Sequence, residues 1–144
     1  MKNSIRNSFF GIAAVLVAGA TVFAQDPPQC IAHVPFAFHA GASTLAAGTY
    51  AITPVAASHA VVRIMNKASG EAIMLMAPRN KQAAQPASKL VFRRYGDQYF
   101  LAQIWTEADA AGRVLKPSKF EKEMRASARN PAGDNLVAIA IGPR

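Results

Sequence analysis

The sequence predicts a mostly β protein: a small antiparallel β-barrel or β-sandwich with one C-terminal amphipathic helix. Short runs of alternating or β-branched apolar residues recur along the chain, and glycine-containing turns separate them. The connections between these runs are too short for crossover helices, which favours antiparallel pairing. One stretch near the C-terminal end has helical spacing instead. These patterns predict about seven strands and one late helix.

The N-terminus predicts a signal peptide over residues 1–24. Lys2 and Arg6 form a positive region, an apolar run extends from Phe9 to Phe23, and Ala24 ends a small-x-small cleavage pattern. A membrane anchor is disfavoured because the run is shorter than the roughly 20 residues that span a bilayer. We therefore expect an exported, periplasmic or extracellular protein that does not span the membrane after cleavage. Residues 25–144 would form its single β-rich domain.

The first strand is expected at Val34–Phe38, after a short lead-in over Gln25–Ala32. Alternation puts the three large apolar side chains of this strand on one face. Pro35 favours an edge position because proline cannot donate a hydrogen bond to a ladder. Gly48 is expected to take a positive φ in a turn that leads into extended Tyr50–Ile52.

A first hairpin is expected from the runs Ala60–Met65 and Glu71–Ala77, joined by a loop in which Gly70 takes a positive φ. The polar stretch Pro78–Ser88 contains two prolines and is expected to be a mobile loop.

The clearest hairpin joins Lys89–Tyr95 to Gln98–Thr106 through Gly96-Asp97, a pair suited to a tight primed turn. This turn pairs Tyr95 with Gln98, and both faces of the hairpin are mostly apolar, so both should be partly buried. Strict alternation predicts one face with Leu90, Phe92, Arg94, Tyr99, Leu101, Gln103 and Trp105, and another with Val91, Arg93, Tyr95, Phe100, Ala102 and Ile104.

The single helix is expected to begin after Ser118 and to run to about Ala128. Ser118 would cap it, and Glu121 would reach back to complete a capping box. Phe120 and Met124 lie four residues apart, which predicts an apolar face on this helix. A turn is expected before the helix, at Ala108–Gly112, and a closing apolar strand after it, at Leu136–Ile141.

No catalytic set is recognisable in the sequence. Ser43 lacks the glycine that follows the serine in a nucleophile elbow. Cys30 and His33 are close in sequence, but no acid or amide is marked to orient the histidine. We therefore predict no catalytic residue and a protein that is not an enzyme.

Metal and cofactor sites are also not predicted. Cys30, His33, His39 and His59 show no paired metal-ligand spacing, although Cys30 and His33 could hold copper or zinc if His39 joined them. The carboxylates of Glu107 and Asp109 fall short of the six oxygens that calcium needs. Phosphate-binding and dinucleotide-binding motifs are absent. Prolines before Cys30 disfavour lipidation, and one cysteine cannot form an internal disulfide.

A basic and aromatic cluster on the central hairpin is the candidate surface-binding site. Such clusters can bind single-stranded nucleic acid, but export makes that partner unsuitable. The simpler alternative is arginine stacked on tyrosine across the hairpin. The net charge of +8, reduced by Lys2 and Arg6 on cleavage, favours anionic envelope polymers or lipid headgroups instead. The candidate residues are Arg93, Arg94, Tyr95, Tyr99 and Trp105.

Three segments together resemble a family of small exported proteins of unknown function common in acidobacterial genomes. They are Val34–Phe38, Leu45–Tyr50 and Leu90–Leu101. The chain departs from the usual family pattern at three positions: Ala37, commonly acidic; Ala46, commonly proline; and Arg93, commonly histidine. The resemblance implies export and a shared fold, and it implies no activity.

Three functions remain open from the sequence. The first is a non-enzymatic structural or binding protein of the cell envelope, which the export signal favours. The second is a carrier that holds a small apolar ligand inside a β-barrel, because both hairpin faces are apolar. The third is an enzyme of unrecognised type, which would need a histidine and an acid together in one cleft.

Overall fold

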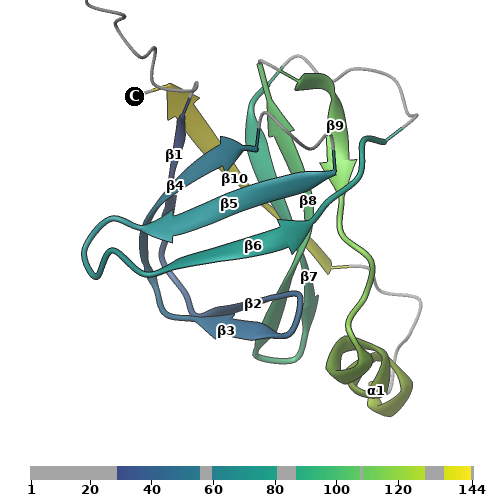
Figure 1. The fold of residues 1–144 in the computed structure, drawn as a ribbon. Coiled ribbons are helices and arrows are strands. Elements are labelled where there is room, and N and C mark those ends of the chain that lie inside the picture. Colours follow the sequence, from purple (N-terminus) through teal and green to yellow (C-terminus); the bar gives the residue numbers. More distant parts are fainter. Residues whose placement is uncertain (1–28, 56–59, 81–86, 108, 129–134, 144) are drawn as a thin grey trace, which may run out of the picture.

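The computed structural model describes residues 29–55, 60–80, 87–107, 109–128 and 135–143 (Figure 1). The expected signal peptide, His59 and residues 81–86 of the expected loop lie outside these ranges. Within them, no helix has both the length and the apolar character required to cross a membrane. The described elements are β1 (Cys30–Val34), β2 (Phe38–Ala40), β3 (Ser43–Leu45), β4 (Gly48–Pro54), β5 (Val61–Asn66), β6 (Ala72–Met76), β7 (Lys89–Tyr95), β8 (Gln98–Thr106), β9 (Asp109–Val114), α1 (Lys119–Ser127) and β10 (Asn135–Pro143).

The strands form one sheet that curves into a nearly closed barrel, with α1 on its outside (Figure 1). The strand order is β3-β2-β8-β7-β10-β1-β4-β5-β6, and β9 pairs with β8. β9 also meets the segment that follows β6, where Val114 N donates to Pro78 O at 3.1 Å and Asn80 N donates to Gly112 O at 3.0 Å. These bonds draw the two ends of the sheet together. The predicted fold class is therefore confirmed.

The predicted central hairpin is confirmed in its limits and in its register near the turn. β7 and β8 have the predicted bounds, Tyr95 pairs with Gln98, and Gly96 has a φ of +60°. Beyond Phe92 and Leu101, however, a β-bulge shifts the register. Leu90 then pairs with Ile104, so the prediction that these two residues lie on opposite faces is wrong. The bulge reverses the alternation that the rest of the hairpin follows.

The N-terminal strand differs from the prediction in its limits. Cys30–Ala32 belongs to β1 rather than to a lead-in, and the expected strand Val34–Phe38 is broken after Val34. Pro35 accounts for the break, because it has no N–H to continue the ladder. The later segment forms β2, which pairs in parallel with β8 through His39 and Phe100. The expectation that all strands pair antiparallel is therefore wrong at this one place in the described sheet.

Two expected turns also differ. Gly48 has no positive φ, because it begins β4 and pairs with Val34 in β1; Gly41 takes the positive φ instead, at +62°. The expected turn at Ala108–Gly112 is replaced by β9, which pairs with β8. The hairpin of β5 and β6 is confirmed, with Gly70 at a φ of +74°.

The barrel interior is filled by apolar side chains from both predicted hairpins and from β1, β2 and β4. The ring of Phe38 meets those of Tyr50 and Phe92 edge to face, with centroids 5.3 Å apart in each pair. Burial of such rings supplies much of the hydrophobic stabilisation of a small domain. The most buried core side chains are Val34, Phe38, Tyr50, Ile52, Val62, Leu90, Phe92 and Ile104.

Candidate functional site

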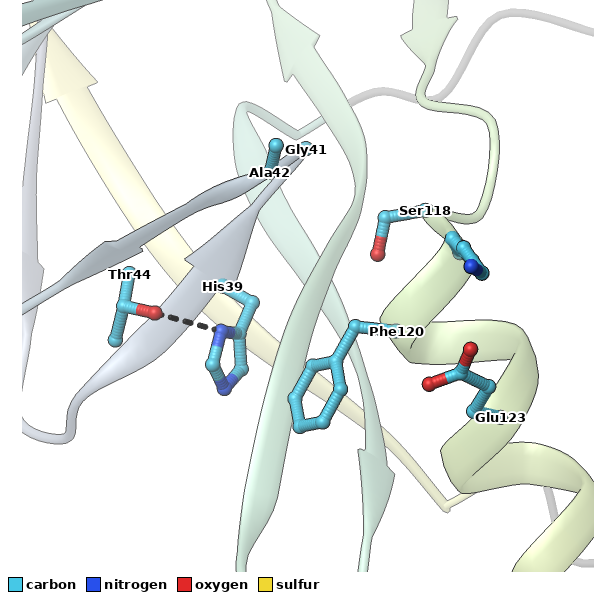
Figure 2. A pocket seen from close by; sticks show the side chains of 8 residues that line it. His39, Gly41, Ala42, Thr44, Ser118, Phe120 and Glu123 are labelled. Atoms are coloured by element: carbon cyan, nitrogen blue, oxygen red, sulfur yellow. Dashed lines mark hydrogen bonds between the residues drawn. The ribbon is translucent and has the colours of Figure 1, made fainter.

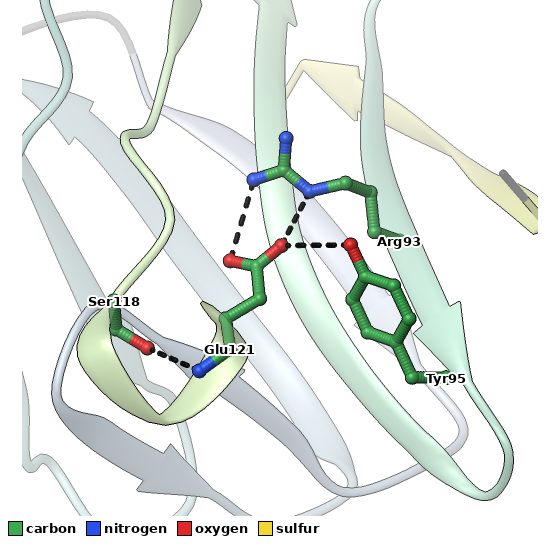
Figure 3. A network of polar contacts seen from close by, with 4 residues as sticks. All are labelled: Arg93, Tyr95, Ser118 and Glu121. Carbon is green, nitrogen blue, oxygen red and sulfur yellow. Dashed lines mark hydrogen bonds and ion pairs between the residues drawn. The ribbon is translucent and has the colours of Figure 1, made fainter. Parts of the chain in front are cut away.

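A partly buried ion pair attaches α1 to the outer face of the β7–β8 hairpin (Figure 3). Arg93 Nε donates to Glu121 Oε1 at 2.5 Å, and a second guanidinium N–H donates to Oε2 at 3.3 Å. The hydroxyl of Tyr95 donates to the same carboxylate at 3.5 Å. Arg93 and Tyr95 are two residues apart on β7, so their side chains leave the same face of the strand. This Arg93–Tyr95–Glu121 network is the polar anchor of the helix.

The anchor corrects two expectations about α1. Ser118 caps the helix as predicted, since its hydroxyl accepts a bond from Glu121 N at 3.1 Å. The carboxylate of Glu121 faces Arg93 rather than the cap, so the second half of the expected capping box is not formed. The expected apolar face is buried only in part: Phe120 is 46% exposed although its ring contacts that of Phe100, and Met124 is half-buried, whereas Glu121 is 3% exposed. The helix is therefore held by the ion pair together with the ring contact between Phe120 and Phe100.

A first groove of about 590 Å³ lies between α1 and the β2–β3 hairpin (Figure 2). The half-exposed ring of Phe120 forms part of its wall and meets the imidazole of His39, with centroids 5.2 Å apart. Hydroxyl groups and one charge of each sign surround these two rings, so the groove combines an aromatic surface with hydrogen-bonding groups. Its lining residues are His39, Gly41, Ala42, Thr44, Ser118, Lys119, Phe120 and Glu123.

His39 is held rigidly in this groove. Its Nε2 lies 2.7 Å from Oε1 of Gln98, and its Nδ1 lies 3.0 Å from the hydroxyl of Thr44. The ring also stacks on Phe100 with a centroid distance of 4.7 Å. Oε1 of Gln98 can only accept, so Nε2 donates to it, and Nδ1 shares a hydrogen bond with the Thr44 hydroxyl. Both ring nitrogens of His39 therefore have hydrogen-bonding partners, which fix the orientation of the imidazole in the groove.

A second, more apolar groove of about 410 Å³ adjoins the first at Gly41. At Gly41, a Cβ would lie 3.2 Å from Leu75, so the β2–β3 turn approaches β6 closely here. The groove is lined by Gly41, Leu75, Met76, Pro78, Leu115 and Lys116.

Exposed lysine and arginine side chains recur every three residues beside these grooves. Residues three apart are neighbours on a helix surface, so the three cations within α1, Lys119, Lys122 and Arg125, form a continuous basic ridge. Glu123 is the one exposed carboxylate within α1. Cations in the first helical turn oppose the helix dipole, and a bound anion would relieve that repulsion. The basic ridge, including the residue just before the helix, consists of Lys116, Lys119, Lys122 and Arg125.

The five sequence-predicted surface residues do not gather on one surface. Arg93 and Tyr95 face α1. Arg94 lies over the ring of Tyr99 at 5.5 Å, which confirms the simpler alternative of arginine stacked on tyrosine. Trp105 is 3% exposed and donates its indole N–H to Gln103. Binding of a partner by this set remains a prediction.

The candidate metal ligands lie apart. Among the residues that the structure describes, no three His, Cys, Asp or Glu side chains come close enough to hold an ion. The imidazole of His33 is exposed and lies 3.2 Å from the hydroxyl of Thr49, whereas His39 lines the first groove.

The thiol of Cys30 is half-buried in β1. Burial raises the pKa of this thiol, and the negative charge of Glu107 raises it further. Less thiolate is then present at neutral pH, and thiolate is the reactive form. We therefore expect Cys30 to be alkylated more slowly than a free cysteine near pH 8, with the pH–rate profile displaced to higher pH. Iodoacetamide labelling followed by mass spectrometry measures this.

The unfolded protein is the matched control for Cys30, because it carries the same single cysteine without burial. Equal pH–rate profiles for the folded and unfolded protein would contradict the expected rise in pKa.

The first groove could not be found from the sequence, because its two walls come from segments about 80 residues apart. The basic ridge could have been found from the sequence, because its cations recur every three residues at Lys116, Lys119, Lys122 and Arg125. The structure adds that Glu121 faces the barrel, so the cations within α1 lie on the exposed side of the helix. Comparison with family models, with curated proteins and with solved structures yields no match for this chain.

Proposed function

We propose that this chain is an exported, non-enzymatic binding protein of the cell envelope, which attaches to anionic envelope polymers or lipid headgroups through the basic ridge and the first groove. The observation that carries the proposal is the placement of Lys119 in both features: it belongs to the ridge and it lines the groove beside Phe120. An anionic group on the ridge would therefore have an aromatic surface and hydroxyl groups within reach.

The other two functions receive less support. A carrier needs an internal cavity, but the barrel interior is occupied by the ring of Phe38, which contacts those of Tyr50 and Phe92. An enzyme would need a histidine and an acid together in one cleft, and the first groove does contain His39 and Glu123. Both ring nitrogens of His39, however, are hydrogen-bonded to Gln98 and Thr44 rather than to that acid. The two grooves described above lie on the outside of the barrel.

Binding to lipopolysaccharide and to phosphatidylglycerol vesicles tests the proposal, with phosphatidylcholine vesicles as the uncharged comparison. We expect binding that weakens as salt is added, because exposed charges are screened. The double variant Lys119→Gln/Lys122→Gln should bind about tenfold more weakly or worse, since each cation near an anionic surface contributes about 1 kcal/mol. Co-sedimentation at several salt concentrations measures both effects.

The matched control is Arg63→Gln/Lys67→Gln, which removes the same charge from exposed positions on and just after β5. We expect this control to bind within about threefold of the unmodified protein. If both double variants lose affinity equally, net charge alone drives binding and the ridge is not the site. If no anionic surface binds the protein, the proposal fails altogether.

A further inference from the structure

Among the residues that the structure describes, the outer edge of β6 is open. β6 lies at one end of the sheet, and within the described residues β5 is the strand that pairs with it. Asn66 N donates to Glu71 O and Ala77 N donates to Ala60 O, which identifies the hydrogen-bonded pairs at the two ends of this ladder. Because bonded and non-bonded pairs alternate in an antiparallel ladder, the N–H and C=O of Met74 and Met76 point away from β5.

This edge lacks the usual protection against pairing. Natural edge strands are commonly interrupted by charged residues, prolines or bulges. β6 reads Ala72-Ile73-Met74-Leu75-Met76, and the side chains of Met74 and Met76 are 64% and 69% exposed. Methionine suits a surface that adapts to a partner, because its side chain is flexible and polarisable.

The chain itself shows which direction a partner strand would take. β9 meets the same edge just beyond β6, with Arg79 and Arg113 in an antiparallel bridge. β9 ends at Val114, and the N–H of Leu115 donates to Ala102 O on the β8 side rather than toward β6. A partner strand placed beside Met76 would extend β9 along the same edge. It would run in the same direction as β9 and therefore antiparallel to β6. The second groove opens at this point, with Leu75 and Leu115 in its lining.

Charges at the two ends of the open edge are opposite in sign. Lys116 lines the second groove at the Met76 end, and Glu71 is exposed at the Ala72 end. A strand antiparallel to β6 begins beside Lys116 and finishes beside Glu71, so it would match these charges with an acidic residue first and a basic residue last.

We propose that the β6 edge binds an extended peptide segment of a partner protein by strand addition. The segment lies antiparallel to β6, starts with an acidic residue, ends with a basic one, and puts alternate apolar side chains into the second groove. Backbone hydrogen bonds supply affinity in this mode, and the groove and end charges supply selectivity. The proposal adds a second partner class to the polyanion binding proposed above and does not depend on it.

The probe is the fluorescently labelled peptide Asp-Val-Thr-Val-Thr-Val-Lys, and its matched control has the two end residues exchanged. We expect saturable binding in fluorescence anisotropy, with the control about fivefold weaker or worse, because its charges meet like charges. Hydrogen exchange should show protection of the Met74 and Met76 amides when the first peptide binds. Equal binding of the two peptides, or no protection at these amides, would overturn the proposal.

Met74→Pro removes an outward N–H without removing a bond to β5, whereas Met74→Ala keeps that N–H and removes only the side chain. We expect Met74→Pro to lose at least about tenfold in peptide affinity and Met74→Ala to lose about threefold or less. Polyanion binding should be unchanged in both, which separates this site from the basic ridge. If Met74→Pro fails to fold, a peptide N-methylated at the positions that face β6 tests the same hydrogen bonds on the unmodified protein.

Self-association is the competing use of this edge. Sedimentation velocity of the unmodified protein and of Met74→Pro measures it directly. A dimer that Met74→Pro abolishes, together with no peptide binding, would assign the edge to a second copy of the chain and overturn the peptide proposal. A monomer that binds the peptide supports it.

Discussion

Glu121→Gln is expected to lower the free energy of unfolding by roughly 2–4 kcal/mol, because it leaves the guanidinium of Arg93 without its charged partner. The Glu121 side chain is 4% exposed and that of Arg93 is 21% exposed, so water compensates the arginine only in part. The partial exposure of Arg93 keeps the expected loss below the upper end of the range for fully buried pairs. Urea unfolding at neutral pH measures this loss.

Glu123→Gln is the matched control, since it makes the same change at an exposed position of the same helix. We expect this control to change stability by about 0.5 kcal/mol or less. Hydrogen exchange of the α1 amides provides a second readout, because the helix can separate locally while the barrel remains folded. Equal stability and equal exchange in the two variants would show that the Arg93–Glu121 ion pair does not anchor α1.

Gly112→Ala is expected to lower the free energy of unfolding by about 3 kcal/mol or more. Gly112 has a φ of +63°, which is unfavourable for alanine, and a Cβ at this position would lie 2.5 Å from Cε3 of Trp105. The indole ring is 3% exposed, so it has little room to move away. Thermal and urea unfolding followed by Trp105 fluorescence report both the stability and the displacement of the ring.

Gly70→Ala separates the cost of the positive φ from the cost of the steric clash with Trp105. Gly70 has a similar φ of +74°, but no atom lies within 4 Å of a Cβ built there. The control should therefore lose only about 1 kcal/mol, the cost of the backbone conformation. In addition, Trp105→Leu should recover part of the stability lost in Gly112→Ala. Equal losses at Gly112 and Gly70 would contradict a steric role for Trp105.

Local features of the fold could be predicted from the sequence, because neighbouring residues determine them. The turn at Gly96-Asp97 sets the limits of β7 and β8, and Ser118 begins the helix. The bulge in β8 could not be predicted, since it depends on which residues must reach the core, and Ile104 does so beside Leu90. The parallel pairing of β2 with β8 likewise joins segments about 60 residues apart that share no local signal.

The candidate site was less predictable than the fold. Arg93 and Glu121 are separated by 28 residues, and the spacing around Glu121 equally fits a capping box. Arg93 also lies in a run of basic and aromatic residues, which favours an exposed binding surface when only the sequence is considered. Only the docking of α1 shows that Arg93 pairs with Glu121 instead of facing solvent. It also shows that the cations of the helix itself are exposed.

The position of β10 has a consequence for how the chain folds. β10 is the last described strand, yet it lies between β1 and β7, and Cys30 pairs with Pro143 across nearly the whole described chain. Sheets closed by contacts so distant in sequence fold slowly, because the loop must be ordered before its contacts form. β1 and β7 cannot complete their pairing until β10 has been synthesised. In a chain that is exported, as we propose, this delay would keep the polypeptide unfolded while it crosses the membrane.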